Sequence, residues 1–251
     1  AKYYGFNIKN LEINSSGINW EVGDDGKTLI QPLSSIKGLG ETAMAEIMKH
    51  RPFKTVEELL FNENIVYSKL NKKALDALCR SGALNNLKDE RFSGLKHFWS
   101  AVVVDRPKTP KKLNENIDKY RPEGEFTTEE TIENLVSLSG VYPINLVLEP
   151  ATLKNIEDKY IPPIGDYDPQ LGEVVWFIPR KINEKKTKNG KVFWIVEVTD
   201  ITNQTTNIKC WGVDAKKDKI WLNRPYLGKL SFDEQWGWST RSIKHTFKLL
   251  G

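Results

Sequence analysis

The sequence contains little cysteine, histidine or methionine and no long apolar segment. Its two cysteines, Cys79 and Cys210, lie far apart, which argues against a disulfide scaffold and favours a reducing, cytoplasmic setting. The three histidines, His50, His97 and His245, show no metal-ligand spacing with the cysteines, so we expect no metal site. No apolar run approaches the roughly 18 residues of a membrane span, and no signal peptide opens the sequence, so we expect no membrane contact.

Length and charge favour a globular protein that meets nucleic acid. The chain has 251 residues, of which 39% are hydrophobic and 28% charged, enough for one large or two modest domains. Its net charge of +4 is uneven, because residues 171–251 hold 15 basic and 8 acidic residues. A basic C-terminal third is typical of a nucleic-acid-binding domain, although ordinary solvated surfaces are also basic. The sequence begins with Ala1, and we expect it to be part of a longer protein.

The most informative stretch runs from Leu33 to Met48. It predicts a short helix, a Gly-x-Gly turn at Gly38-Leu39-Gly40 and a second helix to about Arg51. The two glycines would allow positive φ and close approach of a ligand, and the amides that open the second helix suit an anionic oxygen. Leu39 would hold the turn in the core, while Lys37 would add a cation. This pattern is typical of a helix-hairpin-helix motif, which binds the DNA backbone without reading sequence. The candidate DNA-binding residues are Lys37, Gly38, Leu39, Gly40, Thr42 and Ala43. An ordinary corner between two helices is the alternative that Gly-x-Gly alone leaves open.

Further helices are predicted around this turn. Thr55 and Asn71 are placed to cap helices over residues 55–61 and 71–82, and two more are expected over 91–104 and 128–139. Before the turn, residues 1–30 look β-rich, with a hairpin signal at Asp24-Asp25-Gly26. Residues 105–126 contain three prolines and few apolar residues, and we interpret them as a linker.

From Leu171 onward the pattern predicts a β domain. Short strands are expected over residues 174–182, 192–199, 208–211, 226–232 and 243–249, which suits a small barrel of the OB type. Alternation places Val192, Trp194, Val196 and Val198 on one face of the second strand, and Phe193, Ile195 and Glu197 on the other.

Aromatic side chains interleaved with lysines on an open barrel face suit single-stranded DNA, because any base can stack and any phosphate can be neutralised. The candidate residues are Lys185, Lys186, Lys188 and Lys191 of a basic turn, with Phe193, Lys209 and Trp211 on the strands. The alternative is that Trp176, Trp194 and Trp211 belong to the core.

The order of these motifs resembles that of the alpha subunit of bacterial or phage DNA polymerase III. The resemblance is carried by Ile13–Ser16, Ile36–Glu41, Pro52–Leu59, Asn71–Leu78, Ser81–Leu84, Leu138–Ile144 and Thr187–Lys191. It departs from the family pattern at Tyr142-Pro143, where the usual His-Pro is absent, and at Ile195, where related OB folds carry a stacking aromatic residue.

The resemblance implies an α+β multidomain fold, in which a mostly helical helix-hairpin-helix domain is followed by an all-β OB-fold barrel. The expected domains are residues 1–30 as the end of a fingers-like β segment, 31–104 as the DNA-binding domain, 105–170 as a linker with a helix, and 171–251 as the OB domain.

The expected function is non-catalytic binding of duplex and single-stranded DNA within a replicative polymerase. The sequence shows no catalytic constellation, and the resemblance implies that the carboxylates that hold Mg²⁺ for nucleotide transfer lie elsewhere in the parent polymerase. We therefore expect no cofactor in this chain. The sliding clamp and other replisome proteins are further candidate partners. We expect the chain to be a monomer. The alternatives are a replisome protein-docking module and a DNA repair accessory protein with no polymerase parent.

Overall fold

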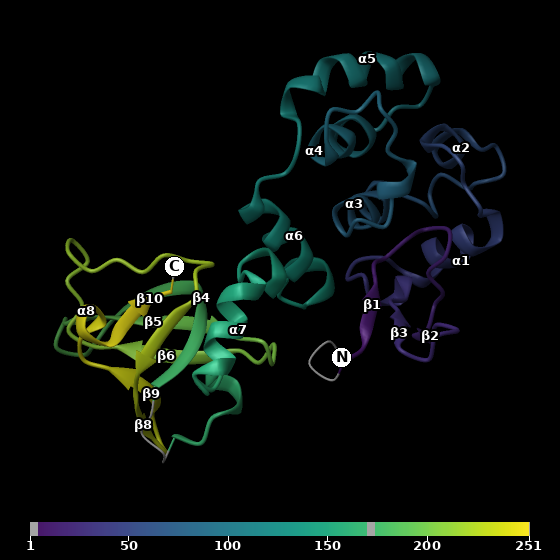
Figure 1. Cartoon of the computed structure of the whole chain (residues 1–251). Helices are drawn as coiled ribbons and strands as arrows, with labels where there is room; N and C mark the ends of the chain where they lie inside the picture. The colour runs from purple at the N-terminus through teal and green to yellow at the C-terminus, as the bar shows by residue number, and fades with distance from the viewer. Residues whose placement is uncertain (1–4, 170–173, 251) are drawn as a thin grey trace. The chain divides into compact units, whose positions relative to one another are not determined.

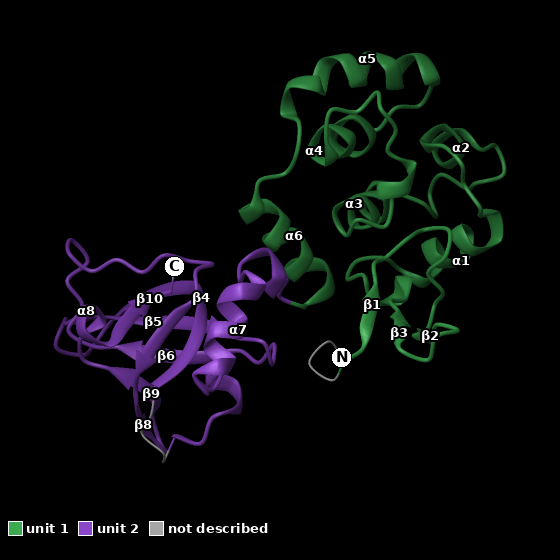
Figure 2. Ribbon diagram, viewed as in Figure 1, with its two compact units in different colours: residues 1–141 green, residues 142–251 purple. Residues whose placement is uncertain are grey.

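The computed structural model describes residues 5–169 and 174–250, which form two compact units, residues 1–141 and 142–251 (Figures 1 and 2). The first unit is mostly helical and the second holds a curled seven-stranded sheet, which confirms the expected α+β class. The predicted boundary between residues 170 and 171 lies outside the described residues. Within them, no helix combines the length and the apolar character needed to cross a membrane.

The first unit begins with a small sheet and continues with helices. Its strands are β1 (Asn7–Lys9), β2 (Glu21–Val22) and β3 (Thr28–Ile30). Its helices are η2 (Leu33–Ser35), α1 (Glu41–His50), α2 (Val56–Phe61), α3 (Lys72–Arg80), η3 (Asn85–Leu87), α4 (Leu95–Trp99), the π-helical η4 (Ser100–Val104), α5 (Pro110–Tyr120), η5 (Arg121–Glu123) and α6 (Thr128–Ser139). Strands β2 and β3 pair antiparallel around the predicted hairpin turn, where Asp25 accepts hydrogen bonds from the amides of Lys27 and Thr28.

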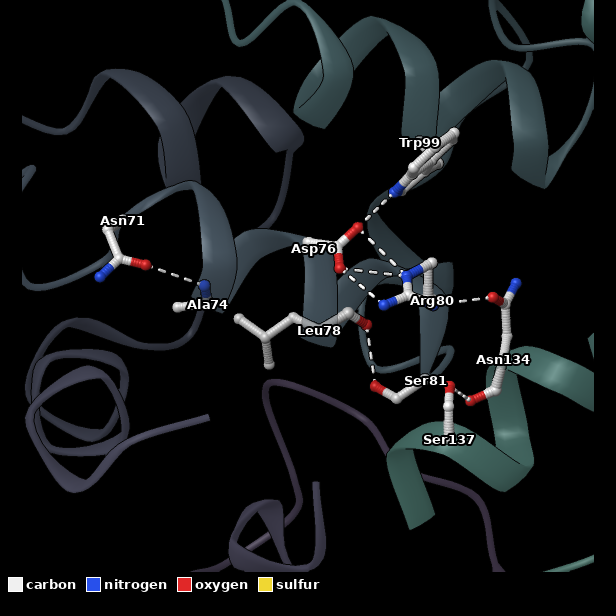
Figure 3. Close-up of polar contacts among 9 residues, drawn as sticks. All are labelled: Asn71, Ala74, Asp76, Leu78, Arg80, Ser81, Trp99, Asn134 and Ser137. Carbon is white, nitrogen blue, oxygen red and sulfur yellow. Dashed lines mark hydrogen bonds and ion pairs between the residues drawn. The ribbon is translucent and has the colours of Figure 1, made fainter. Parts of the chain in front are cut away.

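Polar contacts fix helix α3 against two other helices (Figure 3). Asn71 caps α3 by accepting a hydrogen bond from the amide of Ala74, as predicted. Asp76 accepts hydrogen bonds from Arg80 on its own helix and from Trp99 Nε1 of α4, the latter over 2.8 Å. Arg80 in turn donates to Asn134 Oδ1 of α6 over 3.0 Å. One carboxylate and one guanidinium therefore hold α3, α4 and α6 in a fixed arrangement.

Residues 105–126 differ from the expected linker, because Pro110–Tyr120 form helix α5. Thr109 accepts a hydrogen bond from the amide of Lys112 and so caps the helix. Pro110 occupies the first helical turn, where a missing N–H costs nothing. The proline that we interpreted as a linker signal therefore marks the start of a helix.

Helix α5 is packed into the first unit. Leu113 is fully buried and Ile117 is nearly so, and both belong to the same core as Leu39. The side-chain amide of Asn116 donates to the carbonyl oxygen of Ala101, in the π-helical η4, and His97 Nε2 lies 2.7 Å from the carbonyl oxygen of Ile117. The helix predicted over residues 91–104 begins at Leu95 and continues into this π-helical turn, where the carbonyl oxygen of Ala101 accepts the hydrogen bond from Asn116.

The second unit begins with short helices and continues with the large sheet. Its helices are η6 (Ile144–Leu146), α7 (Pro150–Asp158), η7 (Ile164–Asp166) and α8 (Ile243–Thr246). Its strands are β4 (Val174–Lys186), β5 (Val192–Thr199), β6 (Thr206–Cys210), β7 (Tyr226–Lys229), β8 (Ser231–Asp233), β9 (Gly237–Thr240) and β10 (Phe247–Leu249).

The order of strands makes the sheet curl. The order is β10-β7-β4-β5-β6-β9-β8, so β7 and β8 lie toward opposite edges although only Leu230 separates them in sequence. A chain that passes from one side of a sheet to the other through one residue must bend the sheet into a barrel-like arc. This is the OB-like arrangement expected from the sequence. The sequence did not predict strand β9. The strand predicted over residues 243–249 is divided between helix α8 and strand β10.

We predict that replacing Leu113 by alanine destabilises the first unit by about 2–5 kcal/mol, because it leaves a cavity in the core. Urea unfolding of the whole chain, followed by far-UV circular dichroism, measures the change. Lys111→Ala removes an exposed side chain from the same helix and should leave the transition unchanged. Equal transitions for the two variants would mean that residues 105–126 behave as the linker that the sequence suggested.

Candidate nucleic-acid interface

The turn between η2 and α1 projects its backbone outward because its central side chain is buried. Leu39 is 6% exposed and packs in the core of the first unit, whereas Gly38 and Gly40 on either side are exposed. Gly38 has φ +91°, which favours glycine. Gly40, the N-cap of α1, has φ −77° and ψ 160°, which any residue adopts. The expectation of positive φ at both glycines is therefore wrong for Gly40.

Backbone amides are available at this turn. Four of them have no hydrogen-bond partner among the described residues, those of Gly38, Gly40, Glu41 and Thr42. The next two amides, of Ala43 and Met44, donate to the carbonyl oxygen of Gly40 and so belong to the helix. The free donors lie at the positive end of the α1 dipole, where an anionic oxygen is stabilised.

The predicted hairpin residues divide into exposed and buried members. Lys37 and Thr42 are exposed next to the two glycines, as expected of residues that meet a ligand. Ala43 is 4% exposed and, like Leu39, faces the core. These two residues support the turn without presenting a side chain to a ligand.

Lys37 also connects the turn to the end of helix α6. Its amide donates to the carbonyl oxygen of Leu138 over 2.7 Å. Its Nζ lies 3.2 Å from where a Cβ on Gly140 would be, next to the C-terminal end of α6. A cation is favourable there, because the C-terminal end of a helix carries partial negative charge.

A buried carboxylate anchors α1 behind the turn. Glu46 is 3% exposed and accepts a hydrogen bond from the amide of Val66 over 2.8 Å, and its second oxygen lies 3.2 Å from Lys69 Nζ. The Val66 amide, with Lys69 and His50 nearby, lowers the pKa of Glu46 below its usual value despite burial. The charged carboxylate thereby holds α1 to the loop that precedes α3.

The outer face of the β4–β5–β6 sheet brings together four predicted residues. Phe193 and Trp211 stack with ring centroids 4.6 Å apart and an interplanar angle of 28°. Lys185 lies opposite Phe193 in the β4–β5 register, and Lys209 lies opposite Ile195 in the β5–β6 register. Because directly opposed residues point to the same side of a sheet, the two lysines flank the aromatic pair.

The inner face is the core of the sheet. Trp194, Val196 and Val198 are buried, as the predicted alternation requires, whereas Phe193 is only partly buried. Trp176, which is 1% exposed, also belongs to the core, so the core alternative is correct for Trp176 and Trp194.

The structure adds Trp236, which sequence reasoning missed. It lies in the turn between β8 and β9, is 60% exposed, and has Lys209 Nζ 4.8 Å from its ring centroid. The sequence holds a turn signal here, because Asp233 and Gly237 lie at the two ends of a short hairpin turn. The Asp233 carboxylate accepts hydrogen bonds from the backbone amides of Gln235 and Trp236 in this turn.

The basic turn is shorter than expected. Strand β4 continues to Lys186, because its pairing with β5 extends to Val192, so only residues 187–191 form the turn. Lys185 and Lys186 are consecutive in this strand and therefore point to opposite faces. Lys188 and Lys191 remain exposed in the turn, which Thr187 closes by accepting a hydrogen bond from the Lys191 amide. The structure therefore does not bring Lys186 to the face of Phe193.

The possible metal ligands within the described part of each unit are its histidine, cysteine and acidic side chains. Among residues 5–169 and 174–250, no cluster of three histidine, cysteine or acidic side chains is arranged to hold a metal ion. Both cysteines are buried; burial raises the pKa of the Cys79 thiol strongly and that of Cys210 to about 12, so both stay protonated at neutral pH.

Comparison with known proteins supports the DNA-binding interpretation of the hairpin. The family described as "Helix-hairpin-helix motif" matches residues 5–94, which include the Gly38–Gly40 turn. The chain is 25% identical over 262 residues to DNA polymerase III subunit alpha of Aquifex aeolicus, an alignment that covers 99% of this chain and 21% of that protein.

Two shorter similarities point to the same subunit. DNA polymerase III subunit alpha of Pseudomonas aeruginosa is 32% identical over 99 residues, covering 38% of this chain and 8% of that protein. DNA polymerase III subunit alpha of Pseudomonas fluorescens is 35% identical over 79 residues, an alignment that covers 30% of this chain and 6% of that protein. The chain thus spans about a fifth or less of the length of these relatives. Along nearly all of its length, the chain is therefore similar to about a fifth of DNA polymerase III subunit alpha of Aquifex aeolicus, and its residues 5–94 match the helix-hairpin-helix family.

Proposed function

We propose that this chain is the non-catalytic DNA-binding portion of a replicative DNA polymerase alpha subunit. In this proposal the Gly38–Gly40 turn binds the backbone of duplex DNA, and the outer face of the β4–β5–β6 sheet binds the single-stranded template. The observation that carries the proposal is the family match over the hairpin, combined with exposed, unpartnered amides at that turn.

The geometry of the turn supports binding without sequence readout. Backbone amides and a nearby lysine recognise phosphate oxygens, which every nucleotide carries. The two exposed glycines leave no side chain between those amides and a ligand. Affinity for duplex DNA should therefore be independent of sequence and should fall with salt.

The sheet face supports binding of single strands. The stacked rings of Phe193 and Trp211, with Trp236 nearby, offer flat surfaces to unpaired bases, and Lys185 and Lys209 offer cations to phosphates. Bases paired within a duplex are not free to stack on such rings, so this face should prefer single strands.

Nucleotide transfer itself is assigned, within this proposal, to the rest of the longer subunit. That reaction needs carboxylates that hold Mg²⁺ against the primer end and the incoming phosphates. The acidic residues that the structure describes are not clustered for this purpose. The residues of this chain position DNA and carry out no bond-breaking step.

Replacing Phe193 by alanine should weaken single-strand binding by about tenfold, because one base loses its stacking partner. Fluorescence anisotropy with a labelled oligonucleotide measures the affinity. Ile195→Ala, two residues along on the same face of β5, removes a non-aromatic side chain and should change the affinity less than threefold. If the two variants lose affinity equally, or neither does, the sheet face does not bind by base stacking.

Replacing Gly40 by valine should selectively weaken duplex binding. Gly40 has an ordinary φ and open space around its Cβ position, so the variant should fold, at a cost of about 1 kcal/mol for the altered cap. The valine side chain would stand between the amides and a phosphate, and the duplex dissociation constant should rise about tenfold.

Single-strand affinity serves as the internal control for this variant, since the sheet lies in the other unit. Unchanged duplex affinity in a folded Gly40→Val variant would reject the phosphate-binding role of the turn, and the ordinary-corner alternative would then hold.

A further inference from the structure

A second lysine, distant in sequence, lies over the glycine turn. The nearest atom to the position of a Cβ on Gly38 is Cε of Lys73, at 3.5 Å. Lys73 is exposed in the first turn of α3, and 34 residues separate it from Gly38. The absence of a side chain at Gly38 leaves room for the lysine stem to pass over the turn.

The ammonium group of Lys73 has no partner among the residues that the structure describes. Within the described ranges of the chain, Lys73 takes part in no ion pair or side-chain hydrogen bond. Asp76, three residues further along α3, is at the right spacing to pair with it. That carboxylate is already occupied by Arg80 and by Trp99 Nε1 (Figure 3).

The neighbouring lysine shows the contrast. Lys72 is also exposed, but its Nζ donates to the carbonyl oxygen of Val104 over 2.8 Å and so holds α3 to the end of η4. Of two consecutive lysines, one contributes to the fold and the other lies unpaired beside the turn.

The charge balance at the turn gives Lys73 a role. Glu41, in the first turn of α1, is exposed next to the available amides and would repel a phosphate. Lys37 alone only cancels this charge. With Lys73 the turn carries one net positive charge, which favours an anionic ligand.

We propose that Lys73 is a second backbone-binding lysine of the turn, which contacts the phosphates of duplex DNA together with Lys37. The inference rests on the proposed function of the turn and extends it to α3. Asp76 acts as a positioning residue, since its bonds to Arg80 and Trp99 hold α3 in place and leave Lys73 free.

The test compares Lys73→Gln with the wild-type chain in duplex binding over a series of salt concentrations. Loss of one phosphate contact should reduce the slope of log affinity against log salt by about 0.9. Affinity at moderate salt should fall by about two- to fivefold. Lys73→Arg keeps the charge and should keep the wild-type slope.

The matched control is Lys49→Gln, which removes the same charge from an exposed position in the last turn of α1. It should leave the slope unchanged, and thermal unfolding should be the same for all variants because both side chains are exposed. If the wild-type chain binds duplex DNA and the slopes of Lys73→Gln and Lys49→Gln are equal, the role of Lys73 is overturned. If the wild-type chain binds no duplex at all, the proposed function of the turn fails instead.

Discussion

The burial of Leu39 is the interaction on which the conformation of the Gly38–Gly40 turn depends. Moving this side chain into the core gains about 1.5–3 kcal/mol, and it forces the backbone on either side to face outward. The change of chain direction at this turn requires φ +91° at residue 38. For a residue other than glycine this conformation would cost roughly 1–2 kcal/mol and would cancel much of the free energy gained by burying Leu39. Gly38 therefore makes the turn possible and Leu39 makes it stable. As a consequence, the backbone amides of the turn are exposed and the Lys73 side chain can lie against Gly38.

In the second unit, the alternation of inward and outward side chains along β5 likewise lets burial on one face decide what the other face exposes. Trp194, Val196 and Val198 fix the register of β5, because a slip by one residue would expose all three. With the inward set fixed, Phe193 must face outward and meets Trp211 across the register. The candidate surface for single strands is thus the reverse side of a well-packed core. Both proposed binding surfaces arise where the core constrains the backbone. In the first unit this exposes the glycine turn, and in the second it places an aromatic pair on the outer face of the sheet.

Sequence reasoning predicted the local features well and the tertiary ones poorly. The caps at Thr55 and Asn71, the glycine turn and the faces of β5 follow from propensity and period, which act over a few residues. A turn signal places Trp236 in a hairpin, but its position beside Lys209, like that of Lys73 beside Gly38, depends on which elements the fold brings together. Helix α5 does not follow from local pattern, because its stabilising partners, Ala101 and His97, come from other elements and most of its own residues are polar.

In the proposed function, one chain carries a surface for duplex DNA and a separate surface for single-stranded DNA. The most direct test measures anisotropy of the chain with a single strand, a duplex and a primed junction of equal length, at low and moderate salt. Two sites on one chain raise each other's effective concentration, so we expect salt-sensitive binding that is tightest for the junction. Binding to none of the three would rule out both DNA surfaces and favour a protein-docking module. Equal affinity for all three would mean that the DNA is bound by one general electrostatic surface and not by two distinct ones.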